Sequence, residues 1–267
     1  MSPIDKILSH GFPSDRARLI HGLVGGSALH GIKLEGTDDL DLYGVFIESP
    51  LDCFWEGMDH FVTSTSPQEL RNGPGDVDVT CYSLRRFSRL ALAGNPTIIH
   101  MLFSPAEDGE LEWGRVLGAR AAFLAKSHAR KYVGYADAQL QRMTGVRGLG
   151  KHGQRPELES KFGFDTKAGM HVLRLLHEGI QLMEEGWVTL PRPESPELLA
   201  VRRGERSREW VIQESQRLFE KLRDAAARSP LPDHPDTPAV SKVVVEVYFE
   251  SWRGRGFLNG GLPRIPT

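Results

Sequence analysis

Hydrophobic and polar positions in the first hundred residues follow patterns of strand length. Leu19–Val24 and Leu40–Ile47 are runs rich in apolar residues, which predict two buried strands. Asp76–Tyr82 alternates acidic and apolar residues, which predicts a third strand with its carboxylates on one face. The stretch Ser64–Gly75 is rich in Pro, Gly and Asn and is expected to be a loop.

Helical spacing follows the third predicted strand. Apolar residues recur at helical intervals from Leu84 to Ala91, and Gly94 is a suitable helix end. Asn95 and Pro96 then predict the cap and first turn of a second short helix that reaches Phe103. Near the beginning of the chain, Ser14 predicts the cap of another short helix.

From about Trp113 onward the pattern is helical. Residues 115–143 predict one long helix, and residues 168–185 and 211–222 each carry an apolar stripe at helical spacing. Residues 240–252 fit a helix by spacing, although their valine run also allows a strand. The sequence therefore predicts an α+β fold, with a mixed domain over residues 1–110 and a helical domain over residues 111–267.

Composition is that of a packed protein, and charge is unevenly distributed. Of the 267 residues, 40% are hydrophobic and 25% are charged, which excludes a collagen-like, disulfide-scaffold or wholly disordered chain. The net charge is −2, but residues 1–110 hold 8 Lys and Arg against 16 Asp and Glu, and the remainder holds 25 against 19. An acidic part joined to a basic part suits a protein that binds metal with one and phosphates with the other, although two solvated surfaces of opposite sign explain the counts equally well.

Glycines and paired carboxylates flank the first two predicted strands. Gly25, Gly26 and Ser27 follow the first strand, where an open backbone and a hydroxyl can approach phosphate oxygens. Twelve residues after Ser27, Asp39 and Asp41 stand two apart, which places both carboxylates on one face of a strand. Such a pair repels unless a cation lies between them, and Mg²⁺ accepts both carboxylate and phosphate oxygens. A nucleoside triphosphate with Mg²⁺ is therefore the expected occupant.

Either motif alone is common in flexible loops and exposed turns, whereas the combination at this spacing is specific. It resembles the signature of the DNA polymerase β-like nucleotidyltransferase superfamily. That resemblance implies a polymerase-β-like domain with a short mixed sheet, followed here by a helical bundle. It also implies a third carboxylate on a neighbouring strand, where Asp76 and Asp78 are both available.

Two further runs are similar to the predicted nucleotidyltransferases of the YcgL type. One extends from Asp78 through Tyr82 and Phe87 to Pro96, and the other covers residues 164–175. In that pattern the acidic residue four before the tyrosine is the third ligand, which selects Asp78 and leaves Asp76 as a solvated residue. The chain departs from the pattern at His100, where the family tends to have an acidic residue, so His100 is expected to concern substrate or packing.

The resemblance implies a two-metal mechanism. Asp39 and Asp41 would bridge two Mg²⁺ ions, Asp78 would complete the site and accept a proton, and Gly26 and Ser27 would hold the β- and γ-phosphates of an NTP, expected to be ATP. A hydroxyl would then attack the α-phosphorus, and pyrophosphate would leave.

One face of the predicted helix over residues 168–185 carries a polar row that begins just before it. Lys167, His171 and Arg174 stand at i, i+4 and i+7, and could grip a triphosphate or form a solvated face. The resemblance includes all three and favours nucleotide binding. Spacing alone leaves His30 with a core or surface role.

Basic residues in the helical part are candidates for nucleic-acid contacts. Four of them, with tyrosines between, predict a surface that follows a phosphate backbone: Lys131, Arg147, Lys151 and Arg155. Ordinary surface charge explains them as well. The loop Val146–Arg155 is too rich in glycine and basic residues for ordinary packing and is expected to close over substrate.

Three functions remain open at this stage. The first is transfer of a nucleoside monophosphate to a hydroxyl of an RNA 3′ end, such as that of a tRNA-like acceptor. The second uses a protein hydroxyl as acceptor, as in antitoxin-type AMP transferases, and the third is a nucleotide-binding module without catalysis. Without a run of about 18 apolar residues or a secretory signal, and with Cys53 and Cys81 each alone, no membrane partner and a cytoplasmic location are expected.

Overall fold

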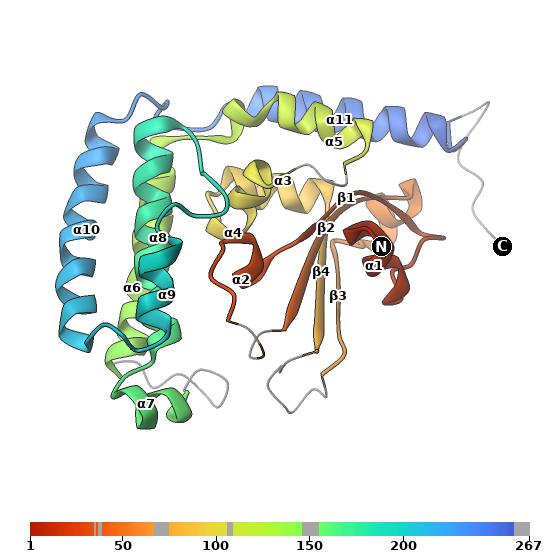
Figure 1. Ribbon diagram of the computed structural model, residues 1–267. Helices are drawn as coiled ribbons and strands as arrows, with labels where there is room; N and C mark the ends of the chain where they lie inside the picture. The colour runs from red at the N-terminus through yellow and green to blue at the C-terminus, as the bar shows by residue number, and fades with distance from the viewer. Residues whose placement is uncertain (35, 37–38, 67–74, 106–108, 146–154, 259–267) are drawn as a thin grey trace.

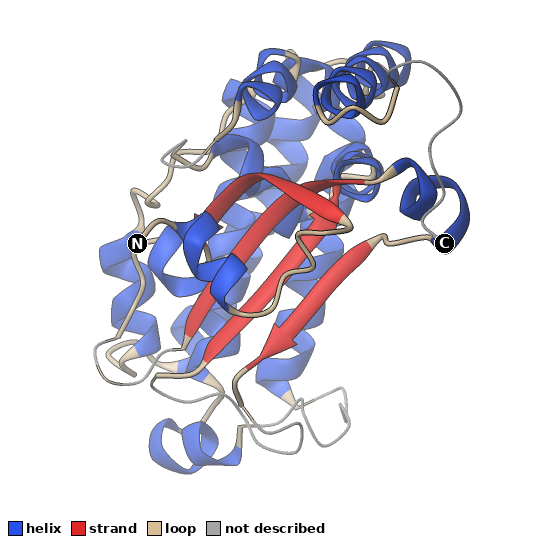
Figure 2. Ribbon diagram, turned by 90° about the vertical axis from the view of Figure 1, so that its right-hand side faces the viewer, coloured by secondary structure: helices blue, strands red, loops and turns tan. Residues whose placement is uncertain are grey.

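A four-stranded mixed sheet forms the first part of the molecule (Figures 1 and 2). The computed structural model describes residues 1–34, 36, 39–66, 75–105, 109–145 and 155–258. The strand order is β1-β2-β4-β3, and β2 pairs antiparallel with β1 and parallel with β4, while β3 pairs antiparallel with β4. The strands are β1 (Ala17–Val24), β2 (Leu40–Glu48), β3 (His60–Ser64) and β4 (Val77–Ser83).

The two faces of the sheet bury different side chains. On β2, Leu42 and Phe46 pack with Ile7 of the first helix in a small cluster on one face, and Val45 and Ile47 join the main core on the other. Because side chains alternate along a strand, Asp41 faces the same side as Val45. The sheet therefore directs the paired acidic residues toward the larger, helix-covered side.

Helices form most of the rest of the described chain. Three of them, α6, α8 and α10, pack into a bundle, and α11 returns to lie beside α5 and contact α3 (Figure 1). The helices are α1 (Pro3–Ser9), α2 (Gly26–Leu29), α3 (Leu84–Leu92), α4 (Pro96–Ile99), α5 (Leu111–Gly118), α6 (Ala129–Thr144), α7 (Pro156–Phe162), α8 (Thr166–Glu185), α9 (Ser195–Arg202), α10 (Arg208–Arg228) and α11 (Thr237–Gly254), with short turns η1 (Asp52–Glu56), η2 (His100–Phe103), η3 (Arg120–Phe123) and η4 (Lys126–His128).

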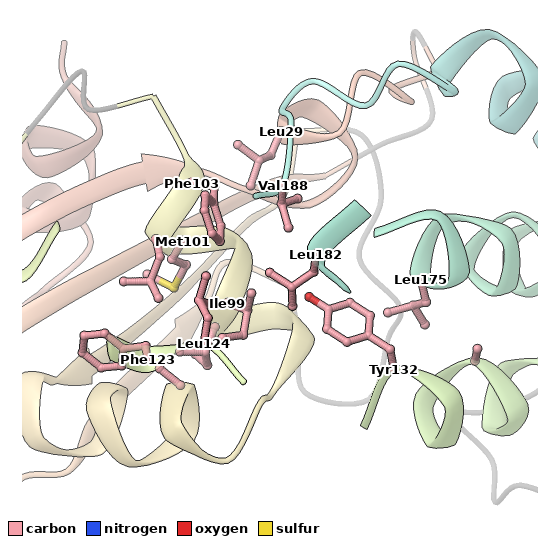
Figure 3. Close-up of a cluster of buried hydrophobic side chains, with 14 of the residues drawn as sticks. Leu29, Ile99, Met101, Phe103, Phe123, Leu124, Tyr132, Leu175, Leu182 and Val188 are labelled. Atoms are coloured by element: carbon pink, nitrogen blue, oxygen red, sulfur yellow. The ribbon is translucent and has the colours of Figure 1, made fainter. Parts of the chain in front are cut away.

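One buried cluster extends across the expected boundary near residue 110. Ile99 and Met101 from the first part pack in the same cluster as Tyr132 and Leu182 from the helical part (Figure 3). A further link is the buried carboxylate of Glu48, which accepts hydrogen bonds from Arg85 Nε and from Tyr248 Oη of α11, both 2.7 Å long. The division into two domains therefore stays a prediction, while the packing joins the two parts through a shared core.

Most expected elements are confirmed, and two expectations are wrong. The three strands, the helix ended by Gly94 and the Asn95-capped helix are present, and residues 240–252 are helical. Residues 115–143 are not one helix, because α5 ends at Gly118 and α6 begins only at Ala129. Ser14 lies in a turn and caps no helix; the first helix is α1, capped by Ser2.

Two more expectations concern membranes and cysteines. None of the helices in the described ranges is both long and apolar enough to cross a membrane. Cys53 and Cys81 are free thiols, and Cys81 is buried in the small cluster beneath α1.

Candidate active site

The three predicted carboxylates converge at one end of the sheet. Asp41 of β2 and Asp78 of β4 are register partners in the parallel pair, and Asp39 immediately precedes β2. One carboxylate oxygen from each of the three lies within 4.8 Å of the others. Asp76 is outside this group, and its Oδ1 accepts a hydrogen bond from Thr65 Oγ1 at 3.3 Å. The register of two parallel strands therefore assembles the acidic cluster.

The glycine motif lies directly against this cluster. The Gly25 amide donates to the Asp41 carbonyl at 2.9 Å, and α2 begins at Gly26, whose φ is +55°. A Cβ built on Gly26 would lie 1.7 Å from Asp41 Oδ2, and one on Gly25 would lie 2.1 Å from the ring of Tyr43. Only glycine fits at either position, because a side chain would displace the carboxylate or the ring.

A cavity of about 260 Å³ connects the acidic cluster to the helical bundle. One wall is formed by the glycine motif and by Asp39 and Asp41, and the opposite wall is formed by one face of α8. The polar and charged residues along the cavity, besides the two aspartates, are Ser27, His30, Tyr43, Thr97, His100, Lys167, His171 and Arg174. The nucleotide-binding residues predicted from the sequence therefore share one cavity, although they come from distant segments.

Helix α8 supplies the basic side of this cavity. Its N-cap is Asp165, a buried residue whose side chain accepts from the Ala168 amide at 2.9 Å. From there Lys167, His171 and Arg174 recur along one face toward the cavity, while Met170 and Leu173 turn into the core. The three residues therefore lie on one face of the helix, as their spacing predicted.

The row is not uniformly cationic. Burial lowers the pKa of His171 well below its usual value, and the positive charges of Arg174 and Lys167 lower it further. His171 is therefore neutral near pH 7 and offers one N–H donor and one acceptor. The charge on this wall comes from Lys167 and Arg174.

The donor set at the acidic end fits a divalent magnesium ion. Mg²⁺ is held in proteins by one or two carboxylates together with substrate phosphates, and here three carboxylates approach one another beside an open cavity. The glycine cradle adds a second reason, because it keeps the space next to Asp41 Oδ2 clear of side-chain atoms. Asp39, Asp41 and Asp78 are therefore the residues that would hold the metal.

Comparison with known proteins identifies the family. Residues 3–244 match the RNA repair pathway DNA polymerase beta family. The chain belongs to this family. Membership places it among the nucleotidyltransferases of the polymerase β type and agrees with its α+β fold.

Two other comparisons add nothing to this assignment. No curated protein matches this member of the polymerase beta family. A solved structure described as a nucleotidyltransferase-like protein from Exiguobacterium sibiricum aligns over 98% of this chain and 96% of its own, with 13% identity and a TM-score of 0.29. A TM-score that low supports no conclusion about fold or function.

Two residues that line the cavity, His30 and His100, and their buried neighbour Glu178 were not predicted as site residues of this family member from the sequence. His30, His100 and Glu178 are all buried, and one ligand atom from each lies within 4.8 Å of the others. Burial alone would raise the pKa of Glu178, but the adjacent Arg174 guanidinium holds that pKa below its usual range. The spacing of Arg174 and Glu178, four apart on a helix, was the available sequence signal; His30 and His100 gave none by spacing.

The predicted nucleic-acid residues are only partly described. Lys131 is exposed on α6, and Arg155 Nη1 donates to Asp165 Oδ2 at 2.9 Å, beside the beginning of α8. Arg147 and Lys151 lie outside the described residues, as does most of the loop over residues 146–155. Contact with RNA stays a prediction for all four.

Proposed function

We propose that this chain is a Mg²⁺-dependent nucleotidyltransferase that moves a nucleoside monophosphate from an NTP, with ATP the expected donor, onto the 3′ hydroxyl of an RNA. The observation that carries the proposal is a cavity lined by carboxylates from one part of the fold and by cationic side chains from another. Asp39 and Asp41 come from the beginning of β2, and Lys167 and Arg174 come from α8.

The separation of charge matches the polarity of a metal-bound triphosphate. A divalent ion among the carboxylates would attract the oxygens nearest the reacting phosphorus, and the cationic wall of α8 would attract the remaining phosphates. Beside the aspartates, Gly26 and Ser27 offer backbone N–H groups and a hydroxyl to the same cavity. A neutral ligand would interact with neither the carboxylates nor the cationic side chains, so the arrangement favours an anionic substrate that carries a metal.

Each residue has a role in this proposal. Bound Mg²⁺ would supply Lewis-acid stabilisation of the phosphoryl oxygens and a lower pKa for the attacking hydroxyl. Asp39, Asp41 and Asp78 hold the metal, and Asp78 also accepts the proton of the incoming hydroxyl. Gly26 and Ser27 orient the phosphates, and Lys167 with Arg174 balances the negative charge that develops on the leaving pyrophosphate.

The RNA acceptor rests on the family and on charge. The family description places its members in an RNA repair pathway. The second part of the chain carries the basic excess, and Lys131 and Arg155 would contact the RNA backbone. We also propose that the chain is of the YcgL type and that it acts in the cytoplasm.

One labelling experiment tests the proposal. The purified chain is incubated with each of the four α-labelled NTPs, Mg²⁺, and either total tRNA or a cell lysate. We expect label on RNA 3′ ends, dependence on Mg²⁺, and loss of about three decades of rate in Asp41→Asn, because several kcal/mol of transition-state stabilisation is removed. The Asp137→Asn variant serves as a control, since Asp137 lies on α6 away from the cavity and its side chain accepts a hydrogen bond from Gln141 of the same helix.

The outcomes separate the alternatives. Label on a polypeptide would replace the RNA acceptor by a protein hydroxyl. Absence of label on any macromolecule, with NTP still bound, would favour a binding module and contradict the transferase proposal. Undiminished transfer by Asp41→Asn would show that the acidic cluster is not the reaction centre.

A further inference from the structure

His100 is buried at the α8 side of the cavity and lacks hydrogen-bond partners. Its exposed fraction is 4%, it lines the cavity, and neither ring nitrogen has a partner among the described residues. An unpaired buried donor or acceptor is costly, so native proteins normally satisfy it with protein, water or ligand. The imidazole therefore marks a place where a molecule other than the chain completes the hydrogen bonds.

The residues around His100 are already engaged with one another. Arg174 Nη1 donates to Glu178 Oε1 at 2.7 Å and lies 3.2 Å from His30 Nε2. Because a guanidinium can only donate, His30 Nε2 must be the acceptor, and its proton is on Nδ1, which lies 3.1 Å from Glu178 Oε1. His30 is thus held neutral in one tautomer, and Glu178 fixes Arg174 in place.

This arrangement leaves two residues that line the cavity with buried nitrogen atoms that have no hydrogen-bond partner among the described residues. Arg174 Nε is buried and has no hydrogen-bond partner among the described residues. His100, packed edge-on against His30 with ring centroids 5.0 Å apart, contributes one N–H in its neutral form. A ligand group with accepting oxygens satisfies both.

A metal ion fits the same atoms poorly. Two imidazoles and a carboxylate are common ligands of zinc, but a metal-bound histidine normally donates its other N–H to an acceptor. Here the other nitrogen of His30 accepts from a guanidinium, and a divalent ion would lie beside the positive charge of Arg174. An oxyanion would accept from Arg174 Nε and from His100, and the negative charge of the nearby Glu178 carboxylate is offset by Arg174, which donates to its Oε1.

The cavity volume and the position of the metal ligands indicate which oxyanion group reaches His100. Pockets that enclose a whole drug-sized ligand have volumes of about 300–1,000 Å³, so a cavity of about 260 Å³ suits part of a nucleotide. Asp39 and Asp41 belong to one cluster and His100 to another, and all three line the same cavity, so a phosphate chain held by metal at the first cluster can extend toward the second. Resting on the proposed function, we propose that His100 contacts the terminal phosphate of the bound nucleoside triphosphate and sets the preference for a triphosphate over a diphosphate.

Equilibrium binding tests this role without relying on turnover. Dissociation constants are measured by calorimetry, with Mg²⁺, for each of the four NTPs carrying a methylene group between the α- and β-phosphates, and for each NDP. In His100→Phe, which keeps a ring but no nitrogen, we expect the triphosphate preference to fall about tenfold, the loss expected for one hydrogen bond to a charged group. The NDP affinity should stay within about twofold.

Two variants separate contact from folding. His100→Gln keeps an amide donor and should recover part of the preference. His128→Phe removes another buried imidazole, one whose Nε2 bonds to the Leu92 carbonyl away from the cavity, and should leave the preference unchanged. Thermal melting of each variant checks that the fold is retained.

Three results would overturn the inference. An unchanged preference in His100→Phe, or equal weakening of NTP and NDP, would make His100 a packing residue, while RNA labelling by the same protein would leave the proposed function standing. Stoichiometric Co²⁺ binding that His100→Phe abolishes would assign the cluster to a metal. Wild-type protein that neither binds an NTP nor transfers label would overturn both proposals.

Discussion

Gly26→Ala tests the contact between the glycine motif and the acidic cluster most directly. The new Cβ would lie 1.7 Å from Asp41 Oδ2 and 2.7 Å from its Cγ, so the carboxylate must retreat by more than about 1 Å. A misplacement of that size at a reaction centre costs about 100-fold in rate. The positive φ of +55° adds a backbone cost of about 1–2 kcal/mol in stability.

Gly57→Ala separates these two effects. Gly57 has φ +74°, and a Cβ there meets no atom within 4 Å, so it carries the backbone cost without the clash. Single-turnover transfer at saturating NTP and Mg²⁺ should therefore fall about 100-fold in Gly26→Ala and little in Gly57→Ala, while urea unfolding shows similar losses of stability. Equal transfer rates for the two variants would refute the claim that Gly26 keeps the Asp41 carboxylate in position.

Three further outcomes follow from the same contacts. Asp78→Asn should lower the rate of Mg²⁺-dependent transfer by about three decades without lowering the melting temperature, and a normal rate would show that Asp78 is not a catalytic residue. Burial lowers the pKa of His128, so the unfolded chain binds its proton more readily, and stability measured by urea unfolding should fall as pH drops below about 6.5. His128→Phe should make that slope smaller without removing it, because burial also lowers the pKa of His30, His100 and His171. Tyr248→Phe should cost about 1–3 kcal/mol by leaving the buried Glu48 carboxylate short of a donor, whereas Tyr135→Phe, at a 42% exposed residue, should cost much less in the same titration.

The acidic cluster was predictable because its geometry is local. A spacing of two residues fixes the relative placement of Asp39 and Asp41, and the strand pattern before and after them fixes the face. Asp78 required more, since only pairing of β2 with β4 places it opposite Asp41, and its selection over Asp76 came from family resemblance. The structure brings together the three residues that this reasoning chose, and their catalytic roles stay a prediction.

The break in the expected long helix depends on contacts far along the chain. No proline lies between residues 115 and 143, so periodicity alone favoured continuity. In the structure, Lys126 donates its amide to the Pro232 carbonyl, and Ala122 accepts from the Asp236 amide, which holds this segment away from a regular helix. Local pattern carries no information about such partners.

Strand β3 was missed because it is an edge strand. His60–Ser64 pairs only with β4 and alternates exposed with half-buried residues, so it lacks the apolar run that marks the inner strands. Its contribution to the site is indirect, through support of the strand that carries Asp78.

The acidic and basic residues of the cavity rest on different parts of the fold. Sequence reasoning named both sets, the acidic pair by local spacing and the basic row by family resemblance, but it could not place one set relative to the other. The acidic set is fixed by a strand register within the first part of the chain. The basic set depends on how α8 lies against the sheet, which is set by the core that Ile99 and Met101 share with Leu182. Arg174 and its buried partner Glu178 move with that helix. Repacking of the shared core would therefore alter the proposed phosphate contacts of Arg174 without changing the aspartates of the acidic cluster. The helical part is therefore a structural component of the cavity that we propose binds the nucleotide, in addition to any role in binding the acceptor.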